Sequence, residues 1–152
     1  MKILGIDPGT ATMGFAVIEK ITGKVEALDF GVITTQPRAS AAERLLEISD
    51  NIAELLEIHR PDLVAVESLF FFKNQTTAFA VAQARGVVLA SVARCGVPLT
   101  ELTPLQVKMA VTGYGRADKK QIQKMVQQIF ALESIPRPDD AADALAIAFA
   151  AS

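Results

Sequence analysis

The stretch Lys2-Ile3-Leu4-Gly5-Ile6-Asp7-Pro8-Gly9-Thr10 decides how the rest of the chain is interpreted. Its apolar run predicts a strand buried on both faces, as in the centre of a mixed sheet. Pro8-Gly9 ends the strand, so the carboxylate of Asp7 is expected at the carboxyl edge of that sheet. An aspartate there can bind a metal ion or cap its own turn. Which of the two applies depends on whether other acids converge on Asp7.

The segments after this strand predict more strands and one helix. Residues 13–20 and 24–35 are rich in β-branched and apolar residues and predict an antiparallel meander with the first strand. The capping box Ser40-Ala-Ala-Glu43, followed by apolar residues at helical spacing, predicts a helix with His59 as its C-terminal cap. Residues 63–67 predict a second buried strand, which is parallel to the first because a helix connects the two.

The second half of the chain predicts mainly helices. The segment 75–94 is apolar nearly all round, so we expect it to be buried on two sides, by the sheet and by a second copy of the chain or the core. Pro98 makes 97–102 an edge strand. Short helices are expected after Thr103 and after Asp118, and a last helix over 139–151. The 152 residues therefore predict a single α/β domain with a central mixed five-stranded sheet flanked by helices.

Four carboxylates are candidates for one metal site. Glu67 ends the strand predicted over 63–67, which is parallel to the first strand, so Glu67 is expected at the same edge of the sheet as Asp7. Asp140 and Asp143 are three apart and share a helix face, although caps or helix-dipole partners at this position would also be acidic. Such oxygen ligands suit Mg²⁺, with Mn²⁺ as an alternative, and two ions per site could support phosphodiester hydrolysis.

Composition limits the possible environments and partners. The net charge is −2, but residues 68–138 hold nine Lys or Arg against three Asp or Glu. Such a block can bind a polyanion or form an ordinary solvated face. The lone Cys95 excludes an internal disulfide and favours a cytoplasmic location, and no apolar run is long enough to span a membrane.

Two stretches combine features that suit nucleic acid. Phe70-Phe71-Phe72-Lys73 follows the second strand, and bases can stack on aromatic side chains beside a lysine. Gly113-Tyr114-Gly115-Arg116 precedes a helix start with Lys119 and Lys120, which together could bind phosphate.

The combined motifs resemble the RuvC family of Holliday-junction resolvases. They are Gly5-Ile6-Asp7-Pro8-Gly9, Glu67-x-x-Phe70-x-x-Lys73-Asn74, Gln83-Ala-Arg85-Gly86 and Asp140-Ala-Ala-Asp143-Ala-Leu145, in order along essentially the whole chain. The resemblance implies an RNase H-like fold, a homodimer, and symmetric, metal-dependent nicking of four-way DNA junctions in recombination and repair. It also suggests the RuvA-RuvB branch-migration complex as a partner.

The same resemblance assigns roles to individual residues. By motif position, Asp7, Glu67, Asp140 and Asp143 would be the catalytic metal ligands. Phe70 would contact the exchange point of the junction. The remaining DNA-binding candidates are basic residues: Lys73, Lys108, Arg116, Lys119 and Lys120. Asp139 lies beside the pattern, and only the Asp-Ala-Ala-Asp spacing favours Asp140 over it.

Three other functions remain open from the sequence. The opening motif also occurs in actin-like and sugar-kinase ATPases, which need about twice this length. A ribonuclease H would place an acid on the first helix, for which Glu43 or Glu47 could serve. A catalytically silent DNA-binding module is the non-enzyme alternative.

Overall fold

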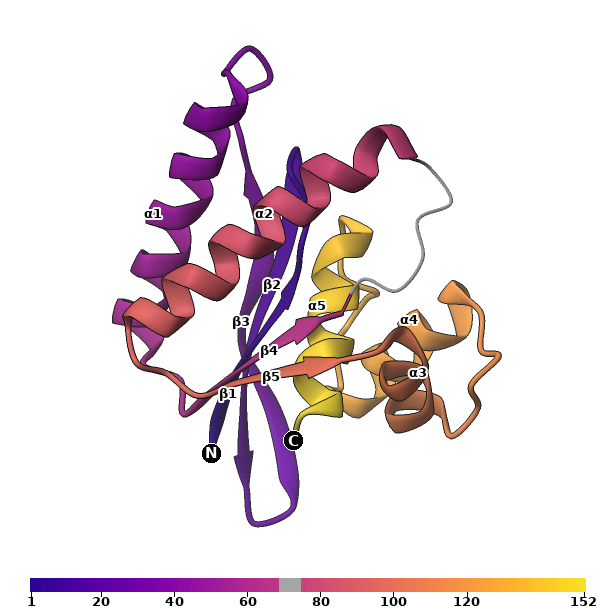
Figure 1. Ribbon diagram of the computed structural model, residues 1–152. Coiled ribbons are helices and arrows are strands. Elements are labelled where there is room, and N and C mark those ends of the chain that lie inside the picture. The colour runs from indigo at the N-terminus through magenta and orange to yellow at the C-terminus, as the bar shows by residue number, and fades with distance from the viewer. Residues whose placement is uncertain (69–74) are drawn as a thin grey trace.

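A computed structural model describes residues 1–68 and 75–152 and places a mixed sheet at the centre of the molecule (Figure 1). The sheet has five strands in the order β3-β2-β1-β4-β5. Their bounds are β1 Lys2–Asp7, β2 Thr12–Ile21, β3 Lys24–Thr34, β4 Leu63–Glu67 and β5 Leu99–Leu102. The first three form an antiparallel meander, whereas β4 is parallel to β1 and β5 is parallel to β4. The predicted mixed sheet, with residues 99–102 at its edge, is confirmed.

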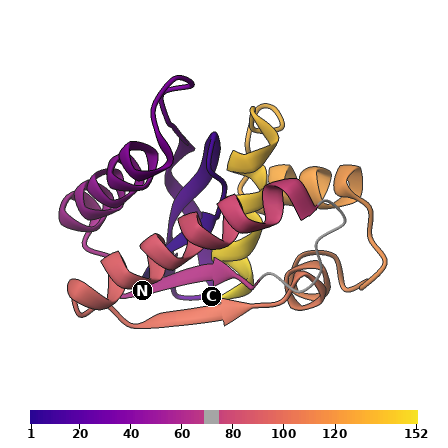
Figure 2. The same ribbon diagram turned by 45° about the horizontal axis from the view of Figure 1, so that its top comes forward.

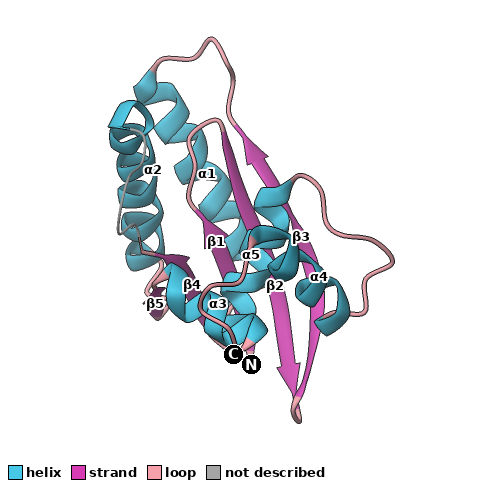
Figure 3. Cartoon of the chain, turned by 90° about the vertical axis from the view of Figure 1, so that its right-hand side faces the viewer, coloured by secondary structure: helices cyan, strands magenta, loops and turns pink. Residues whose placement is uncertain are grey.

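Helices cover both faces of the sheet (Figures 1 and 3). On one face, α1 (Ala41–His59) and α2 (Gln75–Arg94) pack together over the side chains of Leu4, Ile6 and Val17. On the other face, α5 (Asp139–Ala150) lies against β1 and β2. Figure 2 shows α3 (Pro104–Thr112) and α4 (Lys119–Ile129) beside α5. This three-layer arrangement is the α/β architecture that the pattern predicts.

Side-chain caps fix where three of the helices begin. Capping boxes form at Ser40, Thr103 and Asp118, each through reciprocal hydrogen bonds with the Glu or Gln three residues later. They satisfy backbone groups that a helix end leaves without partners. The helix starts at 41, 104 and 119 therefore follow from the sequence.

The prediction that His59 caps α1 is wrong. Arg60 ends the helix in the left-handed conformation, with φ of 47°, and its N–H donates to the carbonyl of Leu56. The imidazole instead reaches β3, where His59 Nε2 lies 3.1 Å from Asp29 Oδ2. His59 therefore pairs with an acid of β3 instead of capping the helix that it ends.

Two glycines let α5 lie close to the sheet. A Cβ on Gly5 of β1 would lie 2.6 Å from the backbone nitrogen of Ala148, and a Cβ on Gly14 of β2 would overlap the carbonyl oxygen of Asp140. Side chains at these positions would force the helix away. Because Gly14 is the cross-strand partner of Asp7, this close packing brings the first turn of α5 to the end of β1.

Helix α2 is buried on one side only. Ala84, Val88 and Val92 face the core, whereas Phe79 is 82% exposed. Among the described residues, nothing outside its own turn of the helix lies within 4 Å of a Cβ built on Gly86. The second buried side predicted from its composition is thus absent within the described chain. None of the described helices combines the length and apolar character that a membrane span requires.

Candidate active site

Three of the four predicted acids line one pocket at the carboxyl edge of the sheet. The parallel pairing of Ile6 with Val66 places the following residues, Asp7 and Glu67, at the same edge. Both line a pocket of about 220 Å³, together with Asp143 from the first turns of α5. Three segments that are far apart in sequence therefore contribute a carboxylate to one cavity.

Burial and mutual repulsion make these carboxylates hard to ionise. Burial, reinforced by the charges of Asp143, Glu67 and Asp140, raises the pKa of Asp7 from 3.8 to about 8. Burial also raises the pKa of Glu67, with the charge of Asp143 adding to it. The pKa of Asp143 is raised by burial despite a hydrogen bond from Lys119. Acids with raised pKa values in one pocket are typical of a functional site.

Asp140 lies beside this pocket rather than in its wall. Its backbone contacts Gly14, next to Asp7, and its charge contributes to the raised pKa of Asp7. The neighbouring Asp139 instead forms ion pairs with Arg137, at 2.8 Å, and with Lys119, at 3.5 Å. The nearby positive charge of Lys119, assisted by its hydrogen bond and by Arg137, keeps the pKa of Asp139 below its ordinary value although desolvation opposes this.

The acids of α5 do not act as helix caps. Pro138 occupies the N-cap position, and this end of the helix has no side-chain cap hydrogen bond. The capping alternative for Asp139, Asp140 and Asp143 is therefore removed, although the helix dipole still favours acids in this turn.

The structure divides the predicted DNA-binding residues into three groups. Lys108 and Lys119 line the pocket with the acids. Arg116 and Lys120 are exposed and do not line it. Phe70 and Lys73 lie outside the described residues.

The chemistry of the donor set fits a hard divalent cation. Asp7, Glu67 and Asp143 supply carboxylate oxygens, the ligands that Mg²⁺ and Mn²⁺ prefer. Across residues 1–68 and 75–152, no three acidic, histidine or cysteine side chains form a ready-made metal site. The ammonium group of Lys119 lies 3.1 Å from Asp143 Oδ2.

Sequence reasoning missed two contacts that support the pocket. The Arg85 guanidinium of α2 forms an ion pair with Glu101 of β5, and its Nε donates to the backbone carbonyl of Glu67 at 3.4 Å. Thr35 Oγ1 donates to the carbonyl of Thr10 at 2.7 Å and so holds the loop that follows Asp7. Arg85 stands in a recognisable motif, but only the fold shows that it links the ends of β4 and β5.

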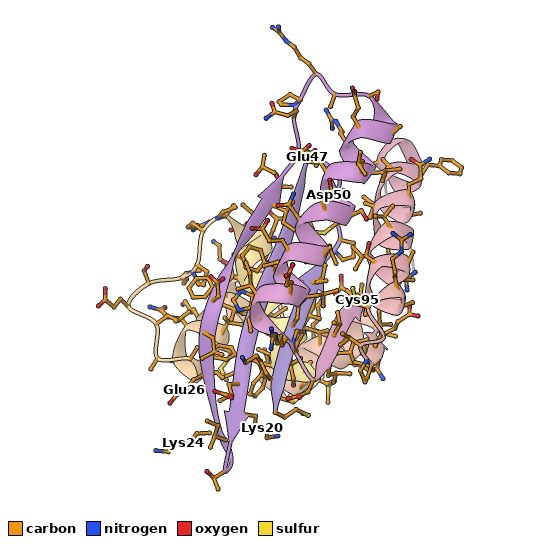
Figure 4. The ribbon with its side chains drawn as sticks, turned by 90° about the vertical axis from the view of Figure 1, so that its left-hand side faces the viewer. Lys20, Lys24, Glu26, Glu47, Asp50 and Cys95 are labelled. Atoms are coloured by element: carbon orange, nitrogen blue, oxygen red, sulfur yellow. The ribbon has the colours of Figure 1, made fainter. Side chains whose placement is uncertain are left out.

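Glu43 and Glu47, the two acids on the first helix that could serve a ribonuclease H site, form hydrogen bonds away from the acidic pocket. Glu43 accepts a hydrogen bond from the Ser40 backbone in the capping box, and Glu47 accepts one from the Gln36 backbone at 3.1 Å. Figure 4, seen from the side of α1, shows Glu47 on this helix in front of the sheet. Helix α5 packs on the opposite face.

The mixed sheet and the carboxylate pocket at its edge define a protein of the RNase H-like class. A family model for the crossover junction endodeoxyribonuclease RuvC matches residues 3–151. The chain therefore belongs to the RuvC family of crossover junction endodeoxyribonucleases.

Individual relatives agree with this assignment. The crossover junction endodeoxyribonuclease RuvC of Syntrophomonas wolfei is 52% identical over 148 residues, which cover 97% of this chain and 86% of the relative. That of Desulfitobacterium hafniense is 54% identical, with 97% and 90% covered. Among solved structures, Thermus thermophilus RuvC in complex with a Holliday junction substrate is 40% identical, with a TM-score of 0.92 over 99% of this chain and 92% of the other.

Proposed function

We propose that this protein resolves Holliday junctions, as a structure-specific endonuclease whose four acids bind divalent cations. One observation carries the proposal: Asp7, Glu67 and Asp143, from β1, β4 and α5, line a single pocket in a chain of the RuvC family. The junction as substrate is supported by the complex of the Thermus thermophilus relative with a Holliday junction substrate. The whole chain would act as one catalytic domain.

The four carboxylates would hold two Mg²⁺ ions, with Mn²⁺ as a substitute. When bound, the ions would lower the pKa of a water molecule and stabilise the leaving oxygen in phosphodiester hydrolysis. Asp7 is the best placed to bind both ions. It is the most buried of the acids, and the charges of Asp143, Glu67 and Asp140 all lie close enough to raise its pKa. Apolar side chains of Val107, Ile122 and Ile147 form part of the pocket wall and limit the access of bulk water.

Basic residues around the pocket would position the DNA. Lys108 lines the pocket, and its charge lowers the pKa of Glu67 against the effect of burial, so it lies within electrostatic reach of a phosphate there. Arg116 and Lys120 are exposed and free of the pocket, which suits contacts to the phosphates of a junction arm. Phe70 and Lys73 would contact the exchange point and its backbone.

A homodimer built on α2 would supply two such sites for symmetric nicking. The open side of this helix carries Phe79, Ala82, Gln83, Gly86 and Ala90. Small residues there would let a second copy approach closely, and Phe79 would be covered. The RuvA-RuvB branch-migration complex and a cytoplasmic location stay predictions.

The dimer can be tested without disturbing the protomer. Among the described residues, nothing outside its own turn of the helix lies within 4 Å of a Cβ on Gly86, so Gly86→Glu should keep the fold and weaken self-association by at least tenfold. Gly86→Ala, which adds little volume, is the matched control. A wild type that sediments as a monomer at micromolar concentration, with and without junction, would contradict the dimer.

A junction nicking assay tests the function itself. The protein is incubated with an end-labelled four-way junction, or with duplex of the same sequence, in Mg²⁺ or in EDTA. We expect paired nicks at symmetric positions in the junction, no nicks in the duplex, and no cleavage in EDTA. An intact junction in Mg²⁺ and Mn²⁺ would instead support a silent DNA-binding module.

A further inference from the structure

The ammonium group of Lys119 lies among the acids of the proposed site. Lys119 Nζ donates a hydrogen bond to Asp143 Oδ2 at 3.1 Å and lies 3.5 Å from Asp139 Oδ2. The same side chain lines the pocket with Asp7 and Glu67. One lysine therefore contacts two acids of α5 and shares a cavity with two acids of the sheet.

The position of Lys119 on its own helix makes this arrangement informative. It is the first residue of α4, where the helix dipole is unfavourable for a positive charge. The carboxylates of Asp143, at 3.1 Å, and Asp139, at 3.5 Å, supply the negative charge that offsets this dipole. The acids of α5 are thus what stabilises the ammonium ion at this point.

We propose that Lys119 is the internal counter-cation of the acidic pocket, which neutralises Asp143 in the metal-free protein and competes with a divalent cation for it. The inference rests on the proposed metal site. Its consequence is a coupling between two events: a cation that takes Asp143 releases the ammonium group, which then becomes available for a DNA phosphate. Lys119 is in this sense a positioning residue, whose partner changes when the site is loaded.

Cation binding in the absence of DNA tests the proposal. Mn²⁺ affinity is measured by titration calorimetry for the wild type, Lys119→Met, Lys119→Arg and Lys124→Met. We expect Lys119→Met to bind Mn²⁺ about tenfold more tightly, because a positive charge next to the ligands is gone. Lys119→Arg should remain near the wild type. Lys124 lies further along α4, is exposed and lines a different pocket, so Lys124→Met should change the affinity by less than about twofold.

Thermal unfolding in EDTA gives a second, independent measurement. Without the ammonium group the carboxylates of the pocket should destabilise the folded protein, so Lys119→Met should unfold at a lower temperature than Lys124→Met. Added Mn²⁺ should then raise its unfolding temperature by more than it raises that of the wild type. Lys119 is 53% exposed, so the variant is expected to fold.

The outcomes separate this inference from the proposed function. Equal Mn²⁺ affinity in the wild type and Lys119→Met would overturn the counter-cation role while leaving the metal site intact. A wild type that binds no Mn²⁺, or binds it as well after Asp7→Asn, would overturn the metal site and the inference with it.

Discussion

Gly14 of β2 lies so close to the backbone carbonyl of Asp140 that a Cβ on the glycine would overlap the carbonyl oxygen. Gly14 is also the cross-strand partner of Asp7. The contact thus joins the strand end and the helix turn that carry the acids. The position of the first turn of α5, and with it the geometry of the site, therefore depends on the absence of a side chain at Gly14.

Replacing this glycine should therefore separate the acids. Gly14→Ala should destabilise the protein by about 1–3 kcal/mol, because the added methyl group meets backbone, and should lower cleavage at least tenfold. Gly31→Ala is the matched control, since the Cβ there would meet only the ring of Phe15, at 3.2 Å. Unfolding curves and single-turnover cleavage measure the two effects. Full activity of Gly14→Ala would show that α5 does not need this close approach.

Asp7→Asn should abolish cleavage and preserve junction binding. The variant loses a carboxylate ligand for the cations. In EDTA the carboxyl of Asp7 keeps its proton up to about pH 8, so the substitution removes neither a positive charge nor a phosphate contact. In EDTA it should bind the junction at least as tightly as the wild type, as measured by electrophoretic mobility shift. Asp140→Asn should behave in the same way. Cleavage by Asp7→Asn within tenfold of the wild-type rate would remove Asp7 from the mechanism.

The raised pKa of Asp7 predicts how the stability of the metal-free protein depends on pH. The folded carboxyl keeps its proton up to about pH 8, whereas the unfolded one loses it near its ordinary value of 3.8. Between these values the folded state binds more protons, so the free energy of unfolding falls as pH rises. The raised pKa values of Glu67 and Asp143 act in the same direction.

Comparison with Asp7→Asn isolates this contribution. In EDTA the variant should gain stability relative to the wild type as pH rises from 5 to 8.5, by roughly 4 kcal/mol, because about three units of this range lie below the folded pKa and each contributes about 1.4 kcal/mol. Saturating Mg²⁺ should stabilise the wild type and reduce the difference. Thermal unfolding at several pH values measures both effects, and parallel stability curves for the two proteins would contradict the prediction.

Lys120 and Phe70 should contribute to junction binding in different ways. Lys120 is exposed, and a contact to phosphate would release about one counterion, so Lys120→Ala should reduce the slope of log affinity against log salt by about one. Phe70→Ala should leave the slope unchanged, because stacking releases no counterions, and should lower cleavage. A salt series measures both, and a slope that changes in Phe70→Ala alone would contradict these assignments.

Local sequence determined most of the fold. The buried strand at 2–7, the meander after it and the helix starts after Ser40, Thr103 and Asp118 depend on neighbouring residues, and the structure has them as predicted. The shared edge of Asp7 and Glu67 also followed from the sequence, because a helix between two strands implies parallel pairing.

Only the tertiary structure decided how the remaining polar residues are used. His59 pairs with Asp29 of β3, Arg85 links the ends of β4 and β5, and Lys119 enters the acidic pocket. Each of these contacts joins residues at least 16 positions apart in sequence, and a polar side chain at the end of an element has many possible partners within reach. Backbone periodicity and capping do not restrict that choice. The packing of α1, α2, α4 and α5 around the sheet does.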